Sequence, residues 1–422
     1  MSLSSWKPIQ SEPSLVNPYA LNPLHRHAPH TPLTESSRHY HLITSTKSLE
    51  LALDAETPEY YCVDTEFSSS NSYSPKLALI QLAINNKVLL IDPQLTSVRP
   101  LSEILEGSTM VVHAGATDAA LLSRAVGVSP AALFDTQLAA AFLGYEQPSL
   151  AALVRHIGSI SLDKSSRMID WTTRPLSLTA LDYAAYDVAY LYSLKDFLAS
   201  QLLAMNRLNW FEEESRVLLS KFLAARDPYT LWMKISGASS LTSSQQRNLM
   251  ILAAWRDSVA SATDQIISKV SPDATLLRTA RRRPLSTSAG VLSVFSAPFI
   301  TEAHAQALLD DLASPRLRSS SLPTPLSKEL DPLVSILLSA AASVATELSL
   351  SPSLVATRHD ITEMVMGRPS RLDSGWRARV ILPLLQEVAV GTSSLRVDPL
   401  TRQIRIDQTR HRDTTNPSGT VA

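Results

Sequence analysis

The stretch Tyr60-Tyr61-Cys62-Val63-Asp64-Thr65-Glu66 joins a short apolar run to two acidic residues. Aromatic and β-branched residues favour strands, so the stretch predicts a buried strand that ends in the acidic triplet. Alternate residues of a strand point to the same face, so the carboxylates of Asp64 and Glu66 are expected to project together. Like charges this close repel one another unless a cation lies between them. Hard carboxylate oxygens suit Mg²⁺ or Mn²⁺, and the stretch therefore predicts a metal site.

Three further apolar runs predict strands after the first one. Residues 77–84 and 88–91 flank Asn85-Asn86, which has the length and composition of a tight hairpin turn. Residues 110–112 form the fourth candidate strand. Helical spacing of apolar residues appears in residues 118–126, 136–143, 149–157 and 178–198. A strand meander followed by helices and short strands predicts one mixed sheet flanked by helices.

Strand patterns fade after about residue 203, and helical spacing replaces them. The helical segments are residues 210–223, 243–262, 303–312, 330–348, 359–365 and 374–388. A Ser- and Pro-rich stretch, residues 314–325, divides them into two helical units. Residues 1–37 predict a disordered leader that contains His25, His27 and His30. A His-rich tract can bind metal, although a plain polar tail has the same composition.

Two more positions offer chemistry that is weak evidence when taken alone. Tyr183 and Asp187 are four residues apart in a helical segment, which places a phenol beside a carboxylate. Helical surfaces often carry such pairs. Asp118 lies where a strand and a Gly turn lead into a helix, and an acid there is commonly a cap or a partner of the helix dipole. The Asp-x-Glu pattern itself recurs by chance, as Asp54-Ala55-Glu56 shows.

The order and spacing of these positions are more specific than any one of them. In both respects the chain resembles the ribonuclease D branch of the DEDD exonucleases, in their DEDDy class. The matching stretches are Val63-Asp64-Thr65-Glu66-Phe67, Leu79-Ile80-Gln81-Leu82, Ile91-Asp92-Pro93, His113-Ala114 through Asp118, Phe134-Asp135-Thr136-Gln137, Leu162-Asp163-Lys164-Ser165, Asp170-Trp171 before Arg174-Pro175-Leu176, and Tyr183-Ala184-Ala185 through Asp187. They cover residues from about 40 to 203 in order. One departure is Ser166-Arg167-Met168, where many relatives carry a Glu or His.

The resemblance implies an α/β ribonuclease H-like exonuclease domain over residues 38–205, with a mixed five-stranded sheet flanked by helices. The helical half is similar to two all-α domains of the helicase-and-RNase-D C-terminal (HRDC) type. The first, over residues 206–313 with a connecting helix, contains Trp232, Trp255-Arg256 and Asp273. A linker at 314–327 precedes a more divergent HRDC-like unit at 328–408, and a disordered tail is expected at 409–422.

The resemblance also implies two divalent cations, Mg²⁺ or Mn²⁺, as cofactors. Asp64, Glu66 and Asp187 would bind the ion that activates water. Asp64 would bridge to the second ion, which stabilises the leaving 3′-oxygen, with Asp118 helping directly or through water. Tyr183 would orient the attacking water, because a phenol with an ordinary pKa of about 10 is a poor base at neutral pH.

Further residues are expected to contact the substrate. In the exonuclease domain they are Phe67, His113, Lys164 and Arg174. In the helical half they are Arg281, Arg282 and Arg283, together with the region of Arg377 and Arg379. Phe67 fits a stacking surface for terminal bases and equally an ordinary core residue. Arg-rich helix faces can bind phosphates, but they are more often merely solvated.

Composition and charge set broader limits. The net charge of −1 divides into −6 for residues 1–203 and +5 for residues 204–422. An acidic half suits metal ions and an Arg-rich half suits phosphates, although plain surface variation would give the same difference. Cys62 is the only cysteine, which excludes an internal disulfide and multi-cysteine zinc sites. The sequence shows neither a signal pattern nor a membrane-length apolar run, and we expect a cytoplasmic protein.

These features predict a 3′→5′ exoribonuclease that releases 5′-nucleotides from RNA 3′ ends. The expected partner is RNA with a free 3′ end, with tRNA precursors and small structured RNAs as the default substrates. We expect a monomer that binds no membrane and needs no small-molecule cofactor. Two alternatives stay open. One is a DNA 3′→5′ exonuclease in repair, because the same acids cut either polymer. The other is a non-catalytic RNA-binding scaffold.

Overall fold

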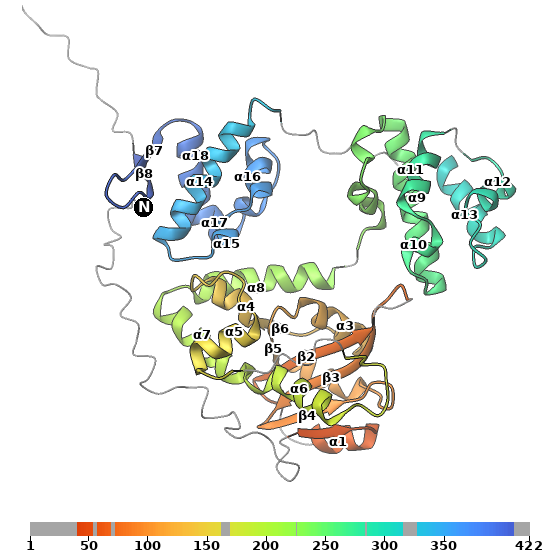
Figure 1. Ribbon diagram of the computed structural model, residues 1–422, viewed down its shortest axis with the longest axis horizontal. Helices are drawn as coiled ribbons and strands as arrows, with labels where there is room; N and C mark the ends of the chain where they lie inside the picture. The colour runs from red at the N-terminus through yellow and green to blue at the C-terminus, as the bar shows by residue number, and fades with distance from the viewer. Residues whose placement is uncertain are drawn as a thin grey trace, which may run out of the picture.

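The computed structural model describes residues 40–53, 57–68, 72–161, 169–224, 226–282, 285–314 and 327–408. An α/β region is followed by two mainly helical units (Figure 1). We call residues 40–203 the sheet region, residues 226–314 the first helical unit and residues 327–408 the second helical unit. The expected leader, the expected tail and nearly all of the expected linker lie outside the described residues, as does Asp54-Ala55-Glu56.

The sheet region is built on one mixed sheet with the strand order β1-β4-β3-β2-β5-β6. The strands are β1 Tyr40–Ile43, β2 Tyr60–Ser68, β3 Lys76–Ile84, β4 Lys87–Ile91, β5 Thr109–Val112 and β6 Ala132–Asp135. β2, β3 and β4 form an antiparallel meander, to which β1, β5 and β6 are added in parallel. The predicted hairpin turn is confirmed, since Asn85 and Asn86 have the positive φ angles (48° and 61°) that a type I′ turn requires.

The expectation of five strands is wrong, because the sheet has six strands. Its two edge strands, β1 and β6, each pair in parallel over four residues. β1 begins with Tyr40-His41 and β6 ends in Asp135, so neither has the long apolar run of a central strand. Such short edge strands form because they pair with a neighbouring strand, and a local sequence pattern does not show this pairing.

Helices cover both faces of the sheet. They are α1 Thr46–Leu53, α2 Ser102–Gly107, α3 Ala116–Val126, α4 Thr136–Ala141, α5 Leu150–Gly158, α6 Leu178–Ala189 and α7 Leu191–Ala204. Along β2, Tyr61 and Val63 face the apolar core beneath α1, α2 and α3, whereas Cys62 faces the core beneath α4, α5 and α7. α6 packs on β3 and β4 on the Cys62 side. Asp64 and Glu66 share the face of Cys62 by strand alternation, so they point toward α6.

The first helical unit follows α8 Leu208–Leu223 and has its own apolar core. Its elements are η4 Pro228–Lys234, η5 Ala238–Ser240, α9 Ser243–Thr263, α10 Ile267–Val270, α11 Asp273–Arg281, α12 Ser288–Val294 and α13 Glu302–Ala313. Trp232 is fully buried, and the Trp255 ring lies 4.8 Å from that of Phe295. Arg256 forms an ion pair of 2.7 Å with Asp273, which joins α9 to the start of α11.

The second helical unit is not purely helical, which corrects the expectation of two all-α units. It contains α14 Asp331–Glu347, α15 Pro352–Val355, α16 Arg358–Val365, η6 Arg371–Asp373, α17 Gly375–Val380, α18 Leu382–Ala389, β7 Ser393–Val397 and β8 Ile404–Gln408. β7 and β8 form an antiparallel hairpin, and Ser343 of α14 donates a hydrogen bond to the carbonyl of Ile404. Among the described residues, no single helix meets the length and hydropathy of a membrane span; α14 passes only together with residues 352–365, across a 115° bend.

The second helical unit shares a continuous apolar core with the sheet region. The buried Trp376 ring lies 5.5 Å from Phe142 of the sheet region and stacks at 5.2 Å on Trp210 of α8. Figure 1 shows α8 running between the sheet region and this unit. Arg207 adds hydrogen bonds to the carbonyls of Phe142 and Ser349. The unit is therefore part of one folded body with the sheet region.

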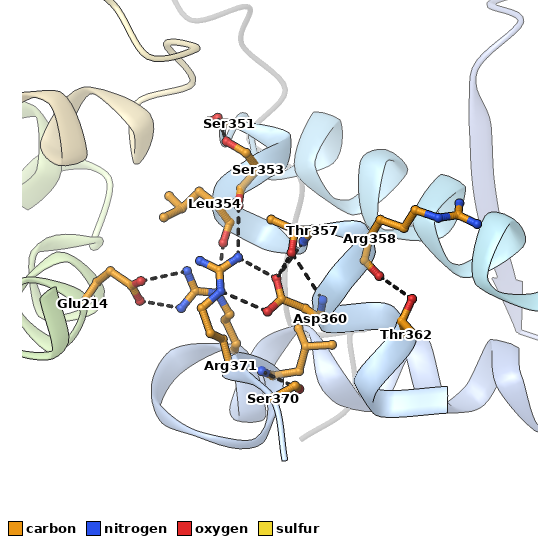
Figure 2. Close-up of polar contacts among 12 residues, drawn as sticks. Glu214, Ser351, Ser353, Leu354, Thr357, Arg358, Asp360, Thr362, Ser370 and Arg371 are labelled. Carbon is orange, nitrogen blue, oxygen red and sulfur yellow. Dashed lines mark hydrogen bonds and ion pairs between the residues drawn. The ribbon is translucent and has the colours of Figure 1, made fainter. Parts of the chain in front are cut away.

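Ion pairs, one of them buried, reinforce this junction. Arg377 is only 3% exposed and binds Glu214 of α8 through both terminal nitrogens. Figure 2 shows Glu214 reaching toward the second helical unit, next to the pair formed by Asp360 and Arg371. The expected RNA contact by Arg377 is wrong, because its guanidinium is enclosed and neutralised inside the protein. Arg379, which is more exposed, pairs with Glu213.

Removing one partner of the buried pair should destabilise the protein. We expect Glu214→Ala to cost about 3–5 kcal/mol in the free energy of unfolding, because it leaves the Arg377 charge buried and unpaired. Glu213→Ala, the matched control at the more exposed pair with Arg379, should cost about 0–1 kcal/mol. Chemical denaturation measures both. Equal losses in the two variants would contradict the account.

Candidate active site

The first part of the site is the acidic end of β2. Asp64 and Glu66 are partly buried there. The register of β2 against β3 shifts between Glu66 and Phe67, which is a β-bulge. Bulges re-aim side chains and are frequent beside active sites. Phe67, 38% exposed, consequently lines the same cavity as the two carboxylates.

The second part is the turn from β5 into α3. Ala114 has a left-handed φ of 56°, and its N–H donates a hydrogen bond of 3.0 Å to Asp135. Gly115 follows, where an added Cβ would lie 2.5 Å from the Cβ of Val112, so only glycine fits. This turn starts α3 with Asp118 in its first turn, buried and directed at the end of β2. Thr65 donates a hydrogen bond to the Asp118 carboxylate.

The third part is one face of α6. Tyr183 and Asp187 lie four residues apart and therefore project together. The Ser177 side chain caps the helix by accepting a hydrogen bond from the N–H of Ala180. The Tyr183 ring lies 6.2 Å from that of Trp171. The predicted helical segment 178–198 is in fact two helices, which meet at Tyr190.

These three parts surround one cavity of about 400 Å³. It is lined by Asp64, Thr65, Glu66, Phe67, His113, Ala114, Thr117, Asp118, Leu150, Tyr183, Asp187 and Leu191. All five residues that the sequence singled out for chemistry are thus together, from three elements up to 123 positions apart in the chain. None of the described lining residues is Lys or Arg, so the cavity concentrates negative charge.

Comparisons with known proteins point to one family. Residues 40–203 match a family model described as 3′-5′ exonuclease. The chain is 32% identical to ribonuclease D of Xanthomonas oryzae pv. oryzae over 82% of this chain and 98% of that relative. It is 31% identical to ribonuclease D of Jannaschia sp. over 81% and 92%. The chain belongs to the ribonuclease D family.

A solved structure supports the same assignment. The crystal structure of Escherichia coli RNase D matches with a TM-score of 0.71 and 28% identity, over 84% of this chain and 99% of that chain. The protein is therefore a hydrolytic exoribonuclease, which decides against the non-catalytic scaffold. Membership of the 3′-5′ exonuclease family also implies dependence on divalent metal ions.

The electrostatics of the cavity agree with a site for cations. Burial, followed by the charges of Asp187, Asp118 and Glu66, raises the pKa of Asp64 well above its usual value. Burial, with Asp187 and Asp118, raises the pKa of Glu66 to about 8. Burial also raises the pKa of Asp187 to about 7 and the pKa of Asp118 above its usual value. A divalent cation would offset the burial of all four carboxylates and the repulsion that adds to it at Asp64 and Glu66.

The four carboxylates provide the hard oxygen ligands that divalent cations prefer, and they line the same cavity. Within the described ranges, however, no three His, Cys, Asp or Glu side chains already form a closed ligand set. The Asp118 carboxylate, which lines the cavity, accepts a hydrogen bond from the Thr65 hydroxyl through one of its oxygens. Side-chain rotation would therefore accompany metal binding at this cavity.

The remaining predicted substrate contacts divide into three groups. Lys164 and Arg283 lie outside the described residues. His113 lines the cavity, and its Nε2 donates to the Pro148 carbonyl while its Nδ1 lies 2.9 Å from the Thr136 hydroxyl. Burial lowers the pKa of His113 to about 4, so the ring is neutral at pH 7.

The described arginines that were predicted to touch substrate lie away from the cavity. Arg174 is bound by Asp92 at 2.5 and 3.0 Å and donates to the Ala78 carbonyl, so it braces the sheet and does not line the cavity. Arg281 and Arg282 are exposed at the end of α11. The RNA contact of these two residues stays a prediction.

Sequence reasoning missed two residues that position the site. Thr65 was only the spacer of the acidic triplet, yet its hydroxyl binds Asp118. Asp135 accepts hydrogen bonds from Ala114 and, as the cap of α4, from Gln137 and Leu138. Its place in the stretch Phe134-Asp135-Thr136-Gln137 was the available signal, since an acid before a helix is a cap pattern.

Gly115→Ala should disturb both stability and catalysis. The added methyl would overlap Val112, at a cost of about 1–3 kcal/mol, and would displace the start of α3 that carries Asp118. Gly127→Ala is the matched control, because Gly127 ends the same helix with φ 96° and open space around it. Melting temperatures should fall in both variants, whereas nuclease activity per folded molecule should fall only in Gly115→Ala. Equal activity would refute this role of Gly115.

The metal-free protein should lose stability as pH rises. In the unfolded chain the carboxyls of Glu66 and Asp187 release their protons near pH 4, and in the folded chain they hold them until about pH 7–8. The folded state therefore binds more protons across this window, and its free energy of unfolding falls with pH. Thermal melts in EDTA between about pH 5 and 8 should show this fall, and Glu66→Gln should flatten it. Glu50→Gln, at an exposed glutamate, is the control and should keep the wild-type slope of stability against pH. If Glu66→Gln kept that slope as well, the raised pKa assigned to Glu66 would be wrong.

Proposed function

We propose that this chain shortens RNA from the 3′ end by two-metal-ion hydrolysis at the β2–α3–α6 cavity and releases 5′-nucleotides. The observation that carries the proposal is the convergence of four carboxylates and one phenol around a single cavity. Such a cavity holds cations against a phosphodiester, which otherwise would be repelled by the same carboxylates.

Each side chain has a distinct part in this proposal. Asp64, Glu66 and Asp187 would hold one cation and Asp64 with Asp118 would hold a second. Mg²⁺ or Mn²⁺ bound there supplies charge that activates water and stabilises the leaving oxygen. Thr65 helps to hold Asp118 in place, because its hydroxyl donates a hydrogen bond to the Asp118 carboxylate.

Tyr183 positions the attacking water through its hydroxyl. It lies one helical turn before Asp187 on the same face of α6, so the phenol and the metal-binding carboxylate approach the water from one side. Phe67 stacks on a terminal base, which its exposure at the cavity edge favours over a core role.

The two helical units are HRDC-type domains that hold RNA or orient it toward the cavity. The first unit supports this with the buried Trp232 and the Arg256–Asp273 pair, at positions that carried the resemblance. Arg281 and Arg282 are exposed on that unit and are the proposed phosphate contacts. We place the active protein in the cytoplasm as a monomer.

The proposed substrates are tRNA precursors and other small structured RNAs. The Escherichia coli relative is described as an exoribonuclease involved in structured RNA processing. A DNA substrate is the weaker candidate, because the relatives named above are ribonucleases.

Substitution of the metal-binding carboxylates tests the proposal. Asp64→Asn and Asp187→Asn should lower kcat on single-stranded RNA by about 10²- to 10⁴-fold and leave RNA affinity nearly unchanged. Asp196→Asn, at an exposed acid of α7, is the matched control and should keep full activity. Full activity in both cavity variants, or a strong preference for DNA over RNA of the same sequence, would overturn the proposal.

A further inference from the structure

A second cavity, larger than the first, lies where the sheet region meets the first helical unit. Its volume is about 670 Å³. The side chains that matter here are Tyr73, Ser123, Arg124, Phe222, Arg226 and Asp257. They come from the β2–β3 connection, α3, the end of α8, the segment between α8 and η4, and α9. The volume is ample for parts of a polynucleotide chain.

The two cavities follow one another along the same face of α3. Thr117 lines the first cavity, and Ala120 and Arg124 line the second. The spacing of three and four residues keeps all three on one helix face, and the rise from Thr117 to Arg124 is about 10 Å. A strand whose 3′ end lies among the carboxylates can therefore continue along α3 into the second cavity.

The second cavity presents positive charge, unlike the first. Arg124 is exposed, and among the described residues its guanidinium has no hydrogen-bond or ion-pair partner. Arg226 is held in place by Asp257 at 2.5 Å and by the Tyr73 hydroxyl at 2.7 Å. The Tyr73 hydroxyl in turn donates to Asp257. Two guanidiniums against one carboxylate leave a positive balance, with Arg124 free to bind a phosphate.

An aromatic ring completes the lining. Phe222, at the end of α8, is 37% exposed and belongs to no apolar cluster of the described part of the chain. An exposed ring beside a free arginine is the combination that binds single-stranded nucleic acid, because bases stack on the ring while phosphates pair with the cation.

We propose that this cavity binds RNA nucleotides on the 5′ side of the two 3′-terminal ones, with Arg124 on a phosphate and Phe222 against a base. The inference rests on the proposed function, since it needs the 3′ end among the carboxylates. The Tyr73–Arg226–Asp257 contacts keep the wall of the cavity in place, and they join the sheet region to the first helical unit. The kcat/KM of the enzyme should then depend on substrate length, because only a longer RNA reaches this junction.

Substrate length provides the test. Arg124→Ala and Phe222→Ala are assayed on a dinucleotide, which fills only the catalytic cavity, and on a single-stranded oligoribonucleotide of about ten residues. Each variant should lower kcat/KM on the longer RNA by roughly tenfold and leave the dinucleotide within about twofold. Arg124→Ala should also reduce the slope of log kcat/KM against log salt by about 0.7, one released counterion on a single strand.

Controls separate this inference from the proposed function. Arg99→Ala, at an exposed arginine outside both cavities, should match the wild type on both substrates. If wild type cleaves both substrates and the two variants behave like Arg99→Ala, the second cavity does not bind RNA and the inference is wrong. An equal loss on dinucleotide and longer RNA overturns it too. If wild type cleaves neither substrate, the proposed function fails instead.

Discussion

Electrostatic repulsion among Asp64, Glu66, Asp118 and Asp187 is the constraint on which the rest of the structure depends. Four carboxylates share a cavity of about 400 Å³ that no described Lys or Arg lines. Burial raises the pKa of all four carboxyls, and the neighbouring acids add to the shift at Asp64 and Glu66, so the folded chain favours bound protons or cations there. Catalysis requires the cations, so the arrangement that weakens the metal-free protein is the one that suits hydrolysis of a phosphodiester.

A rigid scaffold is needed to keep these charges together. The β-bulge after Glu66, the turn at Gly115 and the face of α6 set three backbone segments around one space. The second helical unit stiffens the scaffold, because its Trp376 and Arg377 complete a core shared with the sheet region. The first helical unit has a separate core, and it meets the sheet region through Tyr73, which packs on that core and binds Asp257, and through the ion pair of Lys76 with Asp264. It is suited to guiding a ligand rather than to supporting the fold.

Local patterns in the sequence predicted much of this site. Strand alternation placed Asp64 with Glu66, helical spacing placed Tyr183 with Asp187, and family resemblance united them with Asp118. What local patterns could not give is long-range pairing. The edge strands β1 and β6 form only by pairing with their neighbours. Arg377, which was expected from the sequence to contact RNA at the surface, is bound by Glu214, 163 positions away. The hydrogen bond from Thr65 to Asp118 likewise joins residues 53 positions apart.

Anomalous scattering from Mn²⁺ in crystals with a single-stranded RNA tests the central claim most directly. The account predicts two peaks about 4 Å apart, enclosed by carboxylate oxygens of Asp64, Glu66, Asp118 and Asp187, with the RNA 3′ end beside them. Mn²⁺ peaks held by other residues would contradict the account. An empty cavity would contradict it too, if crystals of the active enzyme bind Mn²⁺ elsewhere.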